Sequence, residues 1–248
     1  MRLAARAVLL SLAALALAWG VFRFYEALPE AALRSVASDI AAGESFKDET
    51  LADLEPKIAA AESEPIPNPD VLRSIAIIRL REAEAAIGSG QSPSKSQAFA
   101  RAEAAARNAL AHAPTDSFLW YAMAWMAKNR SGYGPDVARD LALSYQTGPH
   151  EGWVAVHRNG FALAMLAVLP PALQKDATAE FRNLVASNFI NDAASILTGP
   201  GWPVHQQLLD DLRPVSETIR AQLAHRIADL GFDVSVPGVE RLAPRPWK

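Results

Sequence analysis

The chain contains no cysteine. This absence excludes a thiol nucleophile, a disulfide framework, a cysteine-ligated metal and lipid attachment through an N-terminal cysteine. Aromatic residues make up only 8% of the sequence, and no stretch alternates apolar and polar residues for long enough to predict a β-sheet. The net charge is −3, and the sequence has no basic run of the kind that binds a phosphate backbone. We therefore expect no nucleic acid partner.

Apolar residues account for 50% of the 248 residues, and alanine supplies much of that share. Alanine is the best helix former, and its small side chain lets helices approach closely. Through most of the chain the pattern predicts successive helices with short breaks, and hence an all-α protein. In one of them, Asn68 is expected to cap a helix that begins at Pro69 and places Val71, Ile75 and Ile78 on one face.

The N-terminus predicts a transmembrane anchor. Two arginines lie within residues 1–6, and an uncharged run follows that reaches Tyr25 if the side chain of Arg23 extends to the headgroups. The segment 7–25 is long enough to span a bilayer. Because arginines mark the cytoplasmic side, we expect a single-pass inner-membrane protein with a cytoplasmic N-terminus and a periplasmic remainder.

A cleaved signal peptide is the alternative interpretation of the same segment. Ala16, Leu17 and Ala18 fit the small-x-small cleavage pattern, and cleavage there would leave a soluble periplasmic protein. The apolar character continues through Trp19 and Phe22, which favours the uncleaved anchor. Both interpretations export the remainder of the chain.

Composition predicts three further segments. Residues 26–69 are charged and interrupted by prolines, which indicates a polar linker with one or two short helices. Residues 70–231 carry the pattern of a helical domain, in which residues 204–230 are expected to form one long final helix. The proline-rich segment 232–248 predicts either an extended strap over the helices or a loose end.

Small residues, prolines and tryptophans recur where tetratricopeptide repeats have them, at Ala102, Ala109, Pro114, Trp120, Pro149 and Trp153. The two prolines and the two tryptophans are each separated by close to the repeat period of about 34 residues. Residues 94–165 therefore resemble tetratricopeptide repeats, although Ala106 replaces the usual large aromatic and Ala124 the usual glycine. The resemblance implies antiparallel helical hairpins stacked in a right-handed solenoid.

A second likeness lies in "GPHEGW" at 148–153, followed by Arg158, a Leu-Pro-Pro break at 169–171 and "EFRNLV" at 180–185. In these features the chain resembles small membrane-anchored proteins associated with bacterial exopolysaccharide biosynthesis. The resemblance implies an accessory or scaffold role in exopolysaccharide or capsule synthesis and export. Its partners would be proteins of a membrane-bound assembly machinery, with a glycan as a second kind of ligand. A general envelope interaction module for secretion, division or folding is the alternative.

The histidines do not predict a metal site. His150 and His157 would lie two helical turns apart, about 10 Å by rise, which is too far to share one ion. No zinc-protease, phosphate-binding or dinucleotide-binding motif occurs, so we expect no cofactor.

A glycan-modifying or glycan-cleaving enzyme is the remaining alternative. Glu44 followed by Ser45 resembles the catalytic pair of lytic transglycosylases, but the segments that should follow in that family are missing. Glu44 also lies in a polar region without the apolar pocket that general-acid catalysis requires. We therefore expect a protein that binds rather than catalyses.

The stretch around the Gly-Pro pair at 148–149 predicts a packed corner between two helices. Tyr145 would brace the first helix, and Gly148 would end it in a left-handed conformation. Pro149 would prevent the helix from continuing, and Glu151 would lie in the first turn of the next helix, where the helix dipole favours a negative charge.

The second helix of this corner carries the candidate binding residues. Trp153 and Val156 fit a buried stripe, and Arg158 is expected to pair with Glu151 or with Asp140 on the neighbouring helix. The competing hypothesis is a binding site for a partner segment or a glycan.

That site would be formed by Trp153, His157 and Arg158.

Overall fold

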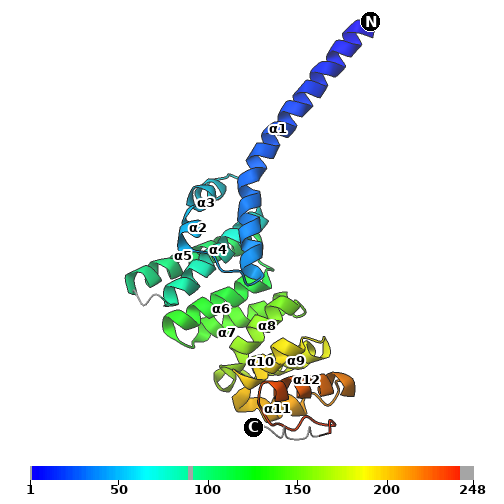
Figure 1. The fold of residues 1–248 in the computed structure, drawn as a ribbon. Helices are drawn as coiled ribbons and strands as arrows, with labels where there is room; N and C mark the ends of the chain where they lie inside the picture. The colour runs from blue at the N-terminus through cyan, green and yellow to red at the C-terminus, as the bar shows by residue number, and fades with distance from the viewer. Residues whose placement is uncertain (1, 89–91, 241–248) are drawn as a thin grey trace. The chain divides into compact units, whose positions relative to one another are not determined.

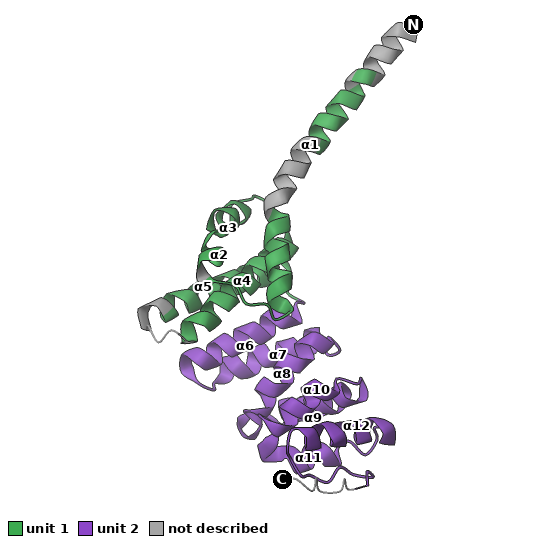
Figure 2. Ribbon diagram, viewed as in Figure 1, with its two compact units in different colours: residues 1–114 green, residues 115–248 purple. Residues whose placement is uncertain are grey.

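The computed structural model describes residues 2–88 and 92–240, and these residues form helices and turns without a strand. The chain divides into two compact units, residues 1–114 and 115–248 (Figure 2). Helices in each unit pack in antiparallel pairs, which confirms the all-α prediction. Residue 70, the predicted start of the helical-repeat domain, lies within the first unit.

The first unit contains α1 (Arg2–Ala41), α2 (Asp48–Ala52), α3 (Glu55–Glu62), α4 (Pro69–Gly88) and α5 (Ser92–His112) (Figure 1). The C-terminal part of α1 packs against α4 and buries Leu33 and Ala37. The core face of α4 is buried as predicted, with Ile75 and Ile78 almost fully covered. Asn68 caps this helix, because its Oδ1 accepts the backbone N–H of Asp70 at 3.1 Å.

Helix α1 is continuous from Arg2 to Ala41. Its described side chains between residues 10 and 20 are all exposed, among them Leu15 and Leu17. Within the described part of the chain, no helix has the length and apolar character needed to cross a bilayer. The predicted anchor 7–25 falls partly on side chains outside that description, those of residues 7–9, 11 and 21–25. The anchor therefore stays a prediction.

The region predicted as a linker contributes two helices to the core of the first unit. Leu51, Leu54 and Ile58 are buried there. Arg79 of α4 is also buried and donates to both carboxylate oxygens of Glu55, at 2.6 and 2.7 Å. This ion pair and the apolar contacts fix α3 on α4.

The second unit contains α6 (Ser117–Ser131), α7 (Pro135–Thr147), α8 (Gly152–Leu163), α9 (Pro171–Ala186), α10 (Ile190–Thr198), α11 (His205–Asp210) and α12 (Glu217–Asp229), with short 3-10 turns at Leu166–Val168 and Trp202–Val204. Helices α6 and α7 form one hairpin and α8 and α9 the next. The core shared by α6 to α12 includes Leu141, Phe181 and Leu197.

The expected final helix over residues 204–230 is wrong. The chain forms α11, a turn that contains Pro214, and then α12, whose N-terminus is capped by Ser216 through the backbone N–H of Ile219. Proline lacks an N–H donor and clashes with the preceding turn, so a helix cannot run through this position undistorted. Helix α10 was not predicted separately.

The segment after α12 lies against the second unit as far as it is described. Val236 is buried, and Arg220 of α12 donates to the backbone oxygen of Pro237. For residues 232–240 this arrangement is the predicted strap. The remaining tail, residues 241–248, lies outside the described residues.

Candidate functional site

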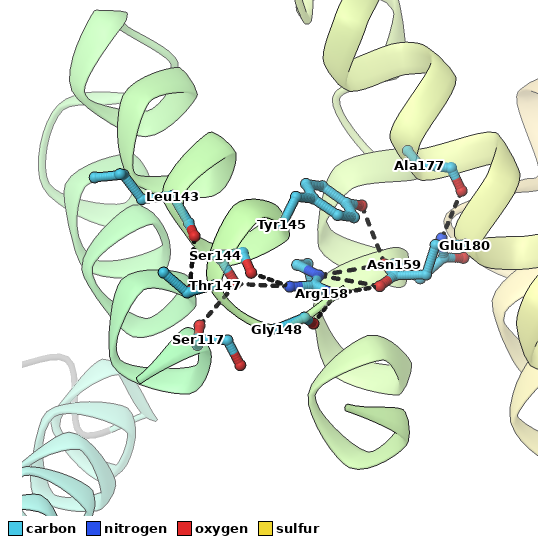
Figure 3. A network of polar contacts seen from close by, with 10 residues as sticks. All are labelled: Ser117, Leu143, Ser144, Tyr145, Thr147, Gly148, Arg158, Asn159, Ala177 and Glu180. Carbon is cyan, nitrogen blue, oxygen red and sulfur yellow. Dashed lines mark hydrogen bonds and ion pairs between the residues drawn. The ribbon is translucent and has the colours of Figure 1, made fainter. Parts of the chain in front are cut away.

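The corner between α7 and α8 is built around Arg158, whose side chain is completely buried (Figure 3). It forms an ion pair with Glu180 of α9, with Nη2 donating to Oε1 at 2.5 Å and Nε to the same oxygen at 3.1 Å. Nη1 donates to the backbone oxygen of Ser144 at 2.6 Å and to its hydroxyl at 3.0 Å. Nη2 also donates to the backbone oxygen of Gly148 at 3.0 Å. All five guanidinium N–H groups are thus used.

These contacts make Arg158 a cap for the end of α7. The last carbonyl groups of a helix lack partners within the helix and carry partial negative charge. Arg158 reaches them from α8, and its remaining donors reach Glu180 on α9. One side chain therefore fastens three consecutive helices.

Tyr145 completes the cluster. Its hydroxyl donates to Oε2 of Glu180 at 3.1 Å, and the Arg158 guanidinium lies 4.2 Å from the centre of its ring. Burial raises the pKa of Tyr145 well above its ordinary value. Burial also raises the pKa of Glu180, while hydrogen bonds from Arg158 and Tyr145 act in the opposite direction. All three side chains of the cluster are buried, and Arg158 has no exposed surface at all.

Glu180 is the partner that sequence reasoning missed. The predicted pairing of Arg158 with Glu151 or Asp140 is wrong; Asp140 instead pairs with Arg139 at 2.8 Å. A signal was present in the sequence, because Glu180 falls at helical spacing between two apolar positions of α9, Ala177 and Leu184. An acidic residue within a buried stripe requires a basic partner.

Gly148 ends α7 for a different reason than predicted. Its φ is −146°, so the backbone is not left-handed. A Cβ at this position would lie 2.4 Å from Oγ and 2.5 Å from Cβ of Ser117, the first residue of α6. The Ser144 hydroxyl donates to the backbone oxygen of Ser117 at 2.7 Å. Glycine is needed here because α6 approaches the corner closely.

The next helix also begins later than expected. Pro149 and Glu151 are exposed, and α8 starts only at Gly152, so Glu151 precedes the first turn and makes no side-chain cap. The predicted buried stripe is correct only in part, because Val156 is partly buried against the core whereas Trp153 is exposed. Val154 and Ala155 are the buried residues, since α8 is rotated by about one position from the expected register.

This rotation leaves Trp153 39% exposed at the edge of a row of aromatic rings. The Trp153 ring lies 4.9 Å from Phe118, Phe118 lies 6.2 Å from Tyr121, and Tyr121 lies 5.7 Å from Phe161. We call these four residues of α6 and α8 the aromatic row. His157 is exposed on α8 one turn after Trp153, on the same side of the helix.

The three candidate binding residues therefore do not form one surface site. Trp153 and His157 lie at the surface, whereas Arg158 is buried among other side chains. Among the described residues, no group of three histidine, aspartate or glutamate side chains is placed to hold a metal ion. Glu44 lies exposed in the turn after α1.

No protein-family model, curated protein or solved structure matches the chain.

Proposed function

We propose that the protein is a non-catalytic, membrane-anchored scaffold that acts by binding in exopolysaccharide or capsule biosynthesis and export. In this proposal the helical hairpins form a tetratricopeptide-like right-handed solenoid on the periplasmic side. The anchor confines them to the membrane surface. Confinement raises their effective concentration towards membrane-bound partners without requiring strong individual contacts.

The aromatic row is the observation that carries the binding role. Partly exposed aromatic side chains supply large contact areas and are enriched in the centres of protein interfaces. The buried pair of Arg158 and Glu180 joins α8 to α9 and thereby fixes the helix that presents Trp153. A surface held by such contacts loses little conformational freedom on binding, which favours recognition.

The anchoring role is supported by the N-terminal half of α1. Leu10, Leu15, Leu17 and Trp19 are each exposed by more than half. A helix that exposes apolar side chains on all sides is stable in lipid rather than in water. The two arginines at its start favour a cytoplasmic N-terminus. The link to polysaccharide rests on the likeness in "GPHEGW" and the segments that follow it.

The test is a deletion strain in which the yield and chain length of surface polysaccharide are measured. Full-length protein is expected to restore both, and the variant Trp153→Ala to restore neither at normal protein levels. Tyr133→Ala is the matched control, because Tyr133 is an aromatic with the same 39% exposure outside the aromatic row. Unchanged polysaccharide in the deletion strain would contradict the polysaccharide role and favour a general envelope module.

The anchor is tested separately with a reporter enzyme that is active only outside the cytoplasm, fused after Lys248. Activity in the membrane fraction is expected. Activity in the soluble periplasmic fraction would indicate a cleaved signal peptide, and an inactive fusion would contradict export altogether.

A further inference from the structure

The loop between α3 and α4 carries an unusually exposed apolar residue. Ile66 is 88% exposed, more than any other large hydrophobic residue whose exposure the structure describes. It lies between Pro65 and Pro67, which restrict the backbone and leave few conformations that could hide the side chain. A single exposed apolar residue is common on protein surfaces, so exposure alone does not indicate a contact surface. The position of Ile66 in the first unit supplies the further argument.

That position is fixed relative to α1. Asn68, two residues after Ile66, donates from Nδ2 to Oε2 of Glu30 at 3.4 Å, while its Oδ1 caps α4. Glu30 is also held by an ion pair with Arg34, at 3.2 Å. In Figure 1 the loop crosses beside α1, on the side of the unit from which the N-terminal half of that helix extends.

The position along α1 places this loop near the proposed bilayer surface. Glu30 follows Tyr25, the end of the proposed anchor, by about 7 Å of helix rise. The headgroup layer on each side of a bilayer is about 5–8 Å thick. Because α1 is helical throughout, no flexible linker separates the apolar run from the contact at Glu30. The loop therefore lies at the level of the headgroups.

We propose that the Pro-Ile-Pro loop is a second membrane contact, in which Ile66 enters the interfacial region of the bilayer beside the anchor. The occupant is lipid rather than protein, because the loop adjoins the segment proposed to span the membrane. Glu64 is exposed two residues earlier, which keeps that part of the loop in water and limits insertion to the tip. The contact would fix the first unit against the membrane as well as tether it.

This inference rests on the proposed anchor, so the experiment measures the membrane contact of the anchor and of the loop separately. The chain has no cysteine, and each engineered cysteine is therefore the only labelling site. Ile66→Cys, Leu15→Cys and Ser45→Cys are each labelled with an environment-sensitive fluorophore in the full-length protein. The variants are reconstituted into vesicles of phosphatidylcholine with a minor share of phosphatidylglycerol. Quenching is measured with nitroxide lipids and with aqueous iodide.

Ser45 is the matched control because it is exposed in the loop that follows the opposite end of α1, and Ala41 at that end lies about 16 Å of helix rise from Glu30. We expect the labels at residues 15 and 66 to be quenched by nitroxide lipids and the label at residue 45 by iodide alone. A lipid-quenched label at 15 with an iodide-quenched label at 66 would overturn the loop contact and leave the anchor intact. Iodide quenching at residue 15 would overturn both.

Discussion

Arg158 is a charged residue with no exposed surface, and its burial is matched by acceptors for every donor it has. A buried ion pair does not stabilise a protein much more than well-packed apolar residues do, because both charges lose their hydration. Removal of one partner is costly, however, since the other is left buried without a counter-charge. The cluster therefore specifies the angle of the corner more than it adds stability.

We expect Arg158→Met to lower the free energy of unfolding by about 3–5 kcal/mol, because Glu180 would remain buried and unpaired. The double variant Arg158→Met/Glu180→Leu should recover part of this loss, since it removes both charges. Chemical denaturation followed by circular dichroism measures each value. An Arg158→Met protein as stable as the natural one would contradict the structural role assigned to this side chain.

Gly148 allows a second prediction at the residue scale. Gly148→Ala should destabilise the protein by about 1–3 kcal/mol through overlap with Ser117. The penalty should shrink in a Ser117→Gly background, where both overlapping atoms of Ser117 are absent and only Oε1 at the flexible end of Glu151, 2.7 Å away, remains. Gly134→Ala is the control, because a Cβ at the N-cap of α7 meets nothing within 4 Å. An equal penalty in both backgrounds would show that backbone conformation, not close approach, requires the glycine.

At the scale of elements, the attachment of α3 to α4 should depend on pH. The hydrogen bonds from Arg79 hold the pKa of Glu55 below its ordinary value of 4.5. The folded carboxyl thus binds a proton less readily than the unfolded one. Its contribution to stability is complete above pH 4.5 and is lost as the pH falls through the lowered pKa.

We therefore expect Glu55→Gln to unfold more easily than the natural protein near neutral pH and to lose less stability on acidification. Denaturation curves between pH 3 and pH 7 measure the difference. Glu62→Gln, a change of the same charge at the exposed end of α3, is the matched control. Parallel pH profiles for the natural protein and Glu55→Gln would contradict a stabilising ion pair.

At the scale of the whole molecule, each unit has its own core, so the second should fold alone. The core cluster of α6 to α12 consists entirely of residues from 115–248. We expect a fragment of these residues to be helical and to unfold cooperatively in circular dichroism, because the core cluster formed by α6 to α12 lies within the fragment. A fragment 115–248 without a cooperative transition would show that the first unit is needed to complete its core.

Most helices could be predicted because their signals are local. The Asn68 cap with Pro69 after it, and the alanine stripe of α5 that includes Ala102 and Ala109, follow from spacing along a few turns. The prediction of a long final helix is wrong because the apolar pattern continues on both sides of Pro214, whereas proline interrupts the helix itself. The residue types of Trp153, His157 and Arg158 suggest binding. Which of them is exposed depends on how α8 is rotated about its axis, and residue spacing along the chain does not specify that rotation.

The amino-acid sequence by itself determined the all-α class, the positions of most helices and the location of a packed corner at Tyr145 to Glu151. Each of these depends on interactions between residues close in the chain. Only the tertiary structure decided that Arg158 pairs with Glu180, that Gly148 makes room for Ser117, and that Trp153 stays partly exposed. All three outcomes depend on contacts between helices that loops separate. The geometry of such contacts is set by side-chain packing rather than by spacing along the chain.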